Sequence, residues 1–420
     1  MEKIRKLFKS DAIGGILIIM ACFLALIFKN SPLIDFYDSF VNFKMGMMFG
    51  EYSLSLTIHH WANDGLMALF FFYIGLEVKR EILVGELSSP SRVALPIIGG
   101  LGGIIFPALA FILITWGDSF SMLGWAIPTV SDTALAVGVL LLLGSKIPPS
   151  IRIFLLLLAI IDDIAVVIII AVFYSGDVNF HLLGIAGGLA FIMLILNLLK
   201  VNKKIFYIIP AVLMWFCFLK SGVHATLAGI LAAVFIPLHP IKGYSMARDL
   251  EYKLHDIITF FVMPIFAFSN AGILITPEAI SHLSHPVSVA IMVGLLLSKP
   301  LGIFIASFAT IKFGISKLPV GANYIQFFGL CVLTGIGMSM SLFICEIAYK
   351  GTNIFYSAEK LAILIASFVA AVVGFVIMKV GIKYQAERLV SVDNSADDKE
   401  KMEEAKMAIE QEKLKEIDIG

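Results

Sequence analysis

The chain has 420 residues, of which 59% are hydrophobic and only 15% are charged. A soluble domain has about 25% charged residues, and a single core could not bury this much apolar surface. Together with a mean hydropathy of +0.96, the composition excludes an ordinary soluble protein and indicates a multi-pass membrane protein. The formal net charge is +0, so the positions of the charges carry more information than their sum.

Polar residues divide the chain into about 12 apolar stretches that we expect to be membrane-spanning helices. The first follows a basic, amphipathic N-terminus, and no small-residue cleavage site comes after Ile13–Phe28. It is therefore predicted to be a retained span and not a signal peptide. The expected spans are 12–29, 59–85, 93–116, 122–143, 150–174, 180–199, 205–219, 223–237, 254–273, 287–311, 325–349 and 358–380.

The loop charges predict which side of the membrane each loop faces. With the N-terminus inside, the cytoplasmic stretches hold 17 Lys and Arg residues, and the outer loops hold only Lys44, Lys220 and Lys350. This bias follows the positive-inside rule and places both termini in the cytoplasm. Residues 1–384 then form a transmembrane domain, and 385–420 form a charged cytoplasmic tail, helical or disordered, that could bind a partner.

The outer segment Phe43–Thr57 differs from the other loops. Gly50-Glu51 lies between two pieces of strand-like composition. This pattern predicts a small β-hairpin, with a plain loop as the alternative.

Two spans contain helix-breaking residues. In the fourth, Pro128, Thr129, Ser131 and Asp132 interrupt an apolar stretch, which is typical of a broken helix whose freed backbone groups bond to hydroxyls. A carboxylate there would neutralise the positive end of a half-helix, or Asp132 could be a plain helix cap. The eleventh span has a similar break at Leu333–Ser341. Paired broken helices favour inverted repeats, here spans 3–5 and 10–12.

The fifth span carries two adjacent carboxylates, Asp162 and Asp163, near its midpoint. A charge there costs about 3 kcal/mol or more, so a function is the expected reason for the pair. Neighbouring side chains on a helix point about 100° apart, so one carboxylate can face a partner helix while the other faces a cavity. Such a pair could exchange protons for a hard cation, Na⁺ or Li⁺; a structural pair is the alternative.

Lys299 is the lone basic residue of the tenth apolar stretch, and Pro300 follows it. A buried ammonium requires a carboxylate, and Asp162 or Asp163 is the natural partner. The alternative is a lysine that extends to the membrane surface.

Mixed charges close the second span and open the ninth, at the predicted cytoplasmic mouth. We expect these groups to sense pH and to attract cations, with ordinary interfacial charges as the alternative. They are Glu77, Lys79, Arg80, Glu81, Arg248, Glu251 and His255, with Asp64 earlier in the second span and His224 in an apolar stretch.

At these residues the chain resembles the NhaA family of bacterial Na⁺/H⁺ antiporters, over about residues 8–383. The resemblance rests on the segments Ser10–Ile16, Phe72–Glu81, Gly124–Leu140, Leu158–Tyr174, Leu219–Ile230, Pro264–Gly272 and Ser298–Ile303. It implies a 12-helix fold in the bacterial inner membrane, with helices 4 and 11 interrupted and crossed. It also implies a homodimer joined partly through the outer hairpin.

The resemblance further implies a role for each matching residue. Asp163 would be the main ligand of Na⁺ or Li⁺, and Asp162 would pair with Lys299 in the proton-loaded state. Asp132 and Lys299 would balance charge at the breaks, with Ser131, Thr129 and Asp64 as supporting polar groups. Glu77, Arg80, Glu81, Arg248, Glu251 and His255 would form the pH-responsive region, although Tyr252 stands where the family often has histidine.

The activity implied is electrogenic, pH-regulated exchange of two protons for one Na⁺, serving pH and sodium homeostasis. It is driven by the proton motive force and needs no cofactor. The alternatives are a K⁺/proton exchanger, a cation channel and an intramembrane aspartyl protease. A lysine opposite the carboxylates disfavours the channel, and the protease needs facing aspartates and a GxGD motif, which the chain lacks. No P-loop, zinc-ligand cluster or nucleic-acid signature occurs, so we expect a transporter that is not an enzyme and has no nucleic-acid partner.

Overall fold

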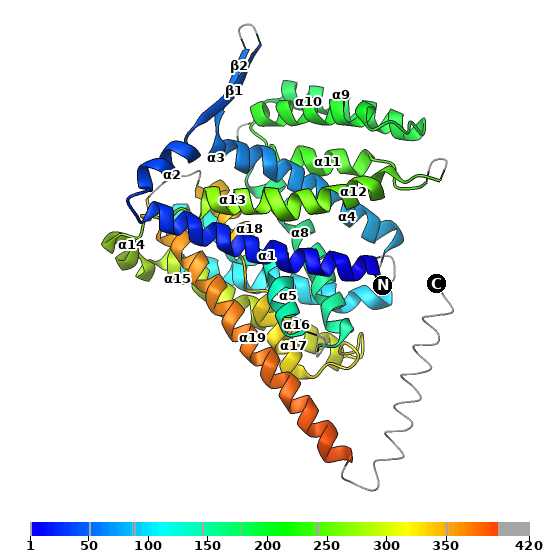
Figure 1. Cartoon of the computed structure of the whole chain (residues 1–420), viewed down its shortest axis with the longest axis vertical. Coiled ribbons are helices and arrows are strands. Elements are labelled where there is room, and N and C mark those ends of the chain that lie inside the picture. The colour runs from blue at the N-terminus through cyan, green and yellow to red at the C-terminus, as the bar shows by residue number, and fades with distance from the viewer. Residues whose placement is uncertain are drawn as a thin grey trace.

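The computed structural model describes residues 2–393, except for 50–51, 86, 88–89, 145–146, 177, 241–242, 350–351 and 353. The described chain is mostly helical, with one small sheet, as the predicted fold class requires (Figure 1).

The first half of the chain contains α1 (Glu2–Lys29), α2 (Ile34–Val41), β1 (Lys44–Phe49), β2 (Tyr52–Thr57), α3 (Ile58–His60), η1 (Trp61–Leu66), α4 (Met67–Val84), α5 (Pro90–Ile114), α6 (Ser119–Met122), η3 (Leu123–Thr129), α7 (Thr133–Leu142), α8 (Pro149–Phe173) and α9 (Phe180–Leu198). The second half contains α10 (Ile205–Ser221), α11 (Leu227–Phe235), α12 (Met246–Ile257), η5 (Ile258–Val262), α13 (Met263–Asn270), α14 (Pro277–Ser281), η6 (His282–Ser284), α15 (Pro286–Val293), η7 (Gly294–Ser298), α16 (Lys299–Lys312), α17 (Tyr324–Leu333), α18 (Met338–Tyr349) and α19 (Ala358–Asp393).

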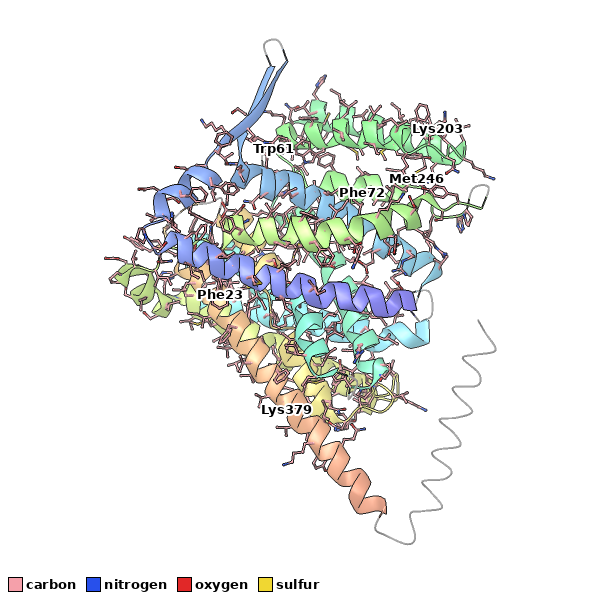
Figure 2. The ribbon with its side chains drawn as sticks, in the orientation of Figure 1. Phe23, Trp61, Phe72, Lys203, Met246 and Lys379 are labelled. Carbon is pink, nitrogen blue, oxygen red and sulfur yellow. The ribbon has the colours of Figure 1, made fainter. Side chains whose placement is uncertain are left out.

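The helices are stacked in layers (Figure 1). The α9–α10 pair lies at one edge, followed by α4 with α11 and α12, then by α1 with α13, and finally by α5, α16, α17 and α19. The hairpin, α2 and α14 lie at one end of the bundle, and the N-terminus lies at the other. Figure 2 shows Trp61 below the hairpin and Lys203 at the opposite end. These are the two ends that the loop charges predict to be outside and inside.

Every predicted span coincides with helical structure, but helix length and composition do not fix the number of membrane crossings. Among the described residues, five helices are long and apolar enough to cross a membrane, or up to eight if each bent pair is one span. The others fall short for physical reasons: α4 carries four charges near its end, from Glu77 to Glu81, and α11 has only 9 residues. The count of 12 and the inverted repeat therefore stay predictions.

The predicted hairpin is confirmed. Strands β1 and β2 pair antiparallel, with Lys44 opposite Thr57 and Phe49 opposite Tyr52, and the Gly50-Glu51 turn lies outside the described residues. At the other end of the chain, α19 continues to Asp393, past the predicted end of the transmembrane domain at 384. The rest of the predicted tail lies outside the described residues.

Close packing of α5 on α16 fixes the helix that carries Lys299. A Cβ atom on Gly102 would lie 2.3 Å from the carbonyl oxygen of Gly302, and the reverse distance is also 2.3 Å. No side chain fits between the two backbones, so glycine is required at both positions. Gly99 and Gly103 also face α16, at Ser307 and Ile303, so this glycine run serves helix packing.

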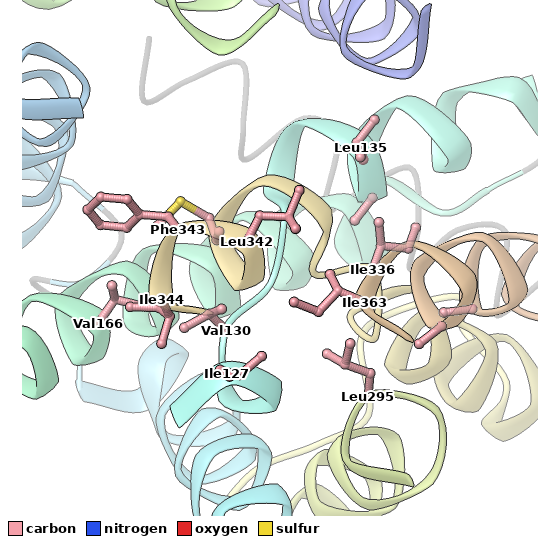
Figure 3. Packing of buried hydrophobic residues seen from close by; sticks show 14 of the residues in the cluster. Ile127, Val130, Leu135, Val166, Leu295, Ile336, Leu342, Phe343, Ile344 and Ile363 are labelled. Carbon is pink, nitrogen blue, oxygen red and sulfur yellow. The ribbon is translucent and has the colours of Figure 1, made fainter. Parts of the chain in front are cut away.

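A large apolar core surrounds the centre of the bundle (Figure 3). Val130 and Ile336, from the two predicted breaks, pack into it with Leu295 and Phe343, and all four are at most 2% exposed. A second, smaller core joins α9, α10, α11 and α12. Charged groups that reach the first core are therefore enclosed by hydrocarbon, where only protein groups can compensate them.

Candidate ion-binding site

Both predicted breaks are present and face each other in the core. The helical segments Ser119–Thr129 and Thr133–Leu142 meet at 42°, and Tyr324–Leu333 and Met338–Tyr349 meet at 43°. Between the halves, Val130 and Asp132 have extended backbones. An interrupted helix leaves N–H and C=O groups without their usual partners, and in hydrocarbon these must be satisfied by protein.

Each break satisfies the free backbone groups of the other. The Asp132 N–H donates to the Ile336 carbonyl at 2.6 Å, and Ser131 Oγ donates to the Thr334 carbonyl at 2.9 Å. Ser341 Oγ donates to the Ile127 carbonyl at 2.8 Å. Neither break is therefore independent, because removing one would leave buried carbonyls of the other without donors.

Asp132 links the two half-helices through its side chain. It caps α7, accepting from the Leu135 N–H at 3.2 Å, and its second oxygen accepts from the Ser339 N–H at 3.1 Å and from the Ser339 hydroxyl. The anion thus lies at the N-terminal ends of both α7 and α18, where helix dipoles favour negative charge. A plain helix cap, the alternative expected from the sequence, accounts for the bond of Asp132 to α7 but not for its bonds to α18. Sequence reasoning gave Ser339 no role, although it lies inside the recognised second break.

Lys299 is paired with Asp162. Lys299 Nζ donates to Asp162 Oδ2 at 2.9 Å and to the Thr129 carbonyl at 2.6 Å, and Ser131 Oγ donates to the same Asp162 oxygen at 2.7 Å. Lys299 is 0% exposed, so the alternative of a lysine that reaches the membrane surface is wrong. The first break thus supplies both a carbonyl for the ammonium and a hydroxyl for the carboxylate.

Asp163, the next residue on α8, does not share the partners of Asp162. It is 8% exposed, and within the described part of the chain it has no hydrogen bond or ion pair. Asp162 Oδ1 is also buried without a hydrogen-bond partner. Three carboxylate oxygens therefore remain available beside a neutralised pair, and a hard cation such as Na⁺ prefers oxygen ligands.

A second group of charges lies where α4 meets α12, at the end of the bundle opposite the hairpin. Arg80 Nε donates to both oxygens of Glu251, at 2.9 and 3.0 Å, and Arg80 also pairs with Glu81. The Tyr73 hydroxyl lies 3.2 Å from His255 Nδ1. Glu77 interacts electrostatically with Glu251 and also with Asp163, so it lies between this cluster and the aspartate pair.

Comparison with known proteins identifies the family of this chain. The model of the family described as Na⁺/H⁺ antiporter 1 matches residues 5–378. The chain belongs to this family. Its relatives include the Na⁺/H⁺ antiporter NhaA of Campylobacter curvus, 48% identical over 90% of this chain and 94% of the relative. The Campylobacter fetus antiporter NhaA 2 is 48% identical over 89% and 94%, and the Campylobacter concisus NhaA is 47% identical over 93% and 96%.

The family assignment confirms the predicted resemblance, and with the apolar helices it makes this a multi-pass membrane protein. The predicted residues form two groups. One group gathers at the breaks: Thr129, Ser131, Asp132, Asp162, Asp163 and Lys299. The other gathers around α4 and α12: Glu77, Arg80, Glu81, Glu251 and His255, with the exposed Arg248 acting electrostatically on Glu251.

Two predicted residues lie elsewhere. Asp64 was expected to support the ion site, but its carbonyl accepts from Trp215 Nε1 at 3.0 Å and its carboxylate interacts with His60, near the hairpin. His224 was expected in the pH-responsive region, but it bonds to Thr226 at 2.8 Å and packs against Phe343. A residue's place along a span does not say which neighbouring helix it will face, so the structure places both residues apart from the groups in which they were expected.

Proposed function

We propose that this chain exchanges Na⁺ or Li⁺ for protons across the bacterial inner membrane, and that ion and protons compete for Asp162 and Asp163. The observation that carries the proposal is the unpaired, buried Asp163 beside the Asp162–Lys299 pair, at the junction of two broken helices. The family and the relatives, which are named Na⁺/H⁺ antiporters, support the same exchange.

Competition follows from the ligands available. A carboxylate that carries a proton cannot bind Na⁺ with the same oxygens, so only deprotonated Asp163 binds the ion. Na⁺ can also bridge to Asp162 through its free Oδ1, and the ion pair with Lys299 can then open. The ion then takes over the charge compensation that the ammonium supplied, and this exchange of partners keeps the buried charge nearly balanced.

The same exchange makes transport electrogenic if two protons enter for each Na⁺ that leaves. One net charge then crosses the membrane per cycle, and the membrane potential contributes about 2.3 kcal/mol per 100 mV. The cytoplasmic α4–α12 charges regulate access, because Glu77 interacts with both Glu251 and Asp163. Protonation changes at this cluster would thereby alter the field at the site.

Asp163→Asn tests the proposal, because it removes one charge and keeps the side-chain volume. In everted vesicles that hold a pH gradient, we expect the unsubstituted chain to give Na⁺- and Li⁺-dependent proton efflux, and Asp163→Asn to give none. Asp35→Asn, at an exposed position of α2, is the matched control and should keep full exchange. Normal Na⁺-dependent proton flux in Asp163→Asn would reject the site.

The same vesicles separate the other functions. Exchange with K⁺ equal to that with Na⁺ would indicate a general cation/proton exchanger. Radioactive Na⁺ uptake that needs no proton gradient and is not accelerated by one would indicate a channel. Exchange of two protons for one Na⁺ moves net positive charge in the direction opposite to Na⁺. A current of this sign after Na⁺ is added to reconstituted membranes tests the two-to-one stoichiometry.

A further inference from the structure

An aromatic layer lies on the hairpin side of the ion site. The Phe343 ring lies 5.7 Å from that of Phe71 and 6.0 Å from that of Phe266, and all three residues are at most 1% exposed. Phe343 is four residues after Ser339, which bonds to Asp132, so the two lie on one face of α18. The layer therefore lies next to the junction of the breaks, on the side that faces the hairpin.

Polar residues follow the aromatic ones on the same three helical segments. Asn270 is one turn beyond Phe266, and its Nδ2 donates to Asn63 Oδ1 at 2.9 Å. Asn63 lies two turns from Phe71 and contacts the His59 ring at 3.3 Å. The Asn270 side chain, 4% exposed, faces His59, and this ring is the group from which its buried amide oxygen can accept. A buried acceptor of this kind favours a proton donor or a cation beside it.

Charged residues complete this group on α18 and α19. Glu346 follows Phe343 by three residues on the same face of α18, and its Oε2 pairs with Lys360 Nζ at 2.8 Å. Glu359 is 2% exposed, has a buried Oε2 without a hydrogen-bond partner, and interacts electrostatically with both Glu346 and Lys360. Two carboxylates thus share one ammonium, which leaves one carboxylate charge for a proton or a Na⁺ ion to neutralise.

Other titratable groups face the same carboxylates. His59 and His60, both on α3, act on Glu346, and Cys345 lies within electrostatic reach of Glu346, Glu359 and Lys360. Both histidines are neutral or positive, so they favour rather than oppose an anionic Glu346. We use the name hairpin-side cluster for His59, Asn63, Asn270, Glu346, Glu359 and Lys360.

We propose that the hairpin-side cluster is a second, transient site for Na⁺ and protons, in which Glu346 receives ions between the outer medium and Asp163. The proposal rests on the proposed antiport function. When the Phe71–Phe266–Phe343 layer separates, Na⁺ passes from Asp163 toward Glu346, and protons pass in the opposite direction. Lys360 limits the affinity of the cluster, so that ions leave it readily.

The test compares the two membrane faces. Right-side-out vesicles present the hairpin face to added Na⁺, and everted vesicles present the other face. We expect Glu346→Gln to raise the apparent KM for Na⁺ about tenfold at the hairpin face, with no change at the opposite face. Lys360→Gln should lower that KM instead, because it removes the competing cation. Opposite signs for the two variants distinguish an ion site from a merely structural ion pair, whose loss has the same effect from either partner.

Controls keep the outcome interpretable. Glu278→Gln, at a fully exposed glutamate on α14 near the same end, should change neither face, and Glu346→Asp should restore much of the affinity. Equal changes at both faces, or the same direction of change in Glu346→Gln and Lys360→Gln, would overturn the proposal. If Glu346→Gln does not accumulate in membranes, Lys360→Gln alone decides by the direction of its effect. Asp163→Asn run in parallel separates the two proposals: exchange in that variant contradicts antiport at Asp163, whatever Glu346→Gln does.

Discussion

The junction of the breaks and the α4–α12 cluster use the same kinds of side chains but hold them in different ways. At the junction, Asp132 and Lys299 bond to the backbone of a crossing segment and are at most 1% exposed. In the α4–α12 cluster, Arg80 and Glu251 bond to each other, and their side chains are 30% and 15% exposed. A buried charge that depends on backbone partners cannot relax when its partner is lost, whereas a partly exposed pair can turn to water. Substitutions should therefore be more damaging at the junction.

Lys299→Ala should give the largest loss of stability. It leaves the buried Asp162 carboxylate without its ammonium, and breaking such a pair costs about 3–5 kcal/mol. Thermal unfolding of the purified chain in detergent measures this loss. The double variant Lys299→Met with Asp162→Asn should recover most of the stability, because no unpaired charge remains. Equal destabilisation by Arg80→Ala would break the comparison between the two regions.

Asp132→Ala should come next. It removes the cap of α7 and leaves the buried Ser339 N–H without its acceptor, which together cost about 1–3 kcal/mol. Asp132→Asn keeps one oxygen that can accept one of these bonds, so its loss in the same unfolding measurement should be smaller. If the two variants were equally unstable, the charge at the helix ends, and not the hydrogen bonds, would be the stabilising feature.

Arg80→Gln should change regulation more than stability. The pair with Glu251 is partly exposed, so its loss costs at most about 1 kcal/mol. Because Glu77 and Glu251 lose a neighbouring cation, we expect the pH at which exchange begins to shift, measured as Na⁺-dependent proton flux between about pH 6 and about pH 9. Lys312→Gln, at an exposed lysine at the end of α16, is the matched control. An identical pH profile in both variants would remove Arg80 from the regulatory region.

The smallest effect concerns Asp249, which precedes the predicted span 254–273. The hydrogen bond from Lys204, with others from Tyr244 and Lys253, lowers the pKa of Asp249 from 3.8 to about 2. A lowered pKa in the folded state stabilises the protein above the unfolded-state pKa, and this stabilisation disappears as the pH falls from about 4 to about 2. Asp249→Asn should therefore cost less than about 1 kcal/mol near neutrality. The difference from the unsubstituted chain in thermal unfolding should vanish near pH 2, and a difference that persists there would have another origin.

The sequence alone was enough to identify the charged residues of the candidate ion-binding site. Charges and prolines inside apolar stretches are costly in a bilayer, so Asp132, Asp162, Asp163 and Lys299 stood out without any knowledge of their neighbours. The hairpin could also be predicted from the sequence, because a Gly-containing turn between strand-like segments is a local signal. The resemblance to a family added the roles of these residues and the charges of the α4–α12 cluster.

Only the tertiary structure decided which groups meet. It assigned Lys299 to Asp162 and left Asp163 free, and it brought Ser339 to Asp132. It also placed Asp64 and His224 away from the sites where they were expected. The cost of burying a charge is fixed by residue type and depth, which a sequence reveals. The partner that compensates the charge depends on how helices distant in sequence rotate and cross, and that is settled only when their side chains pack.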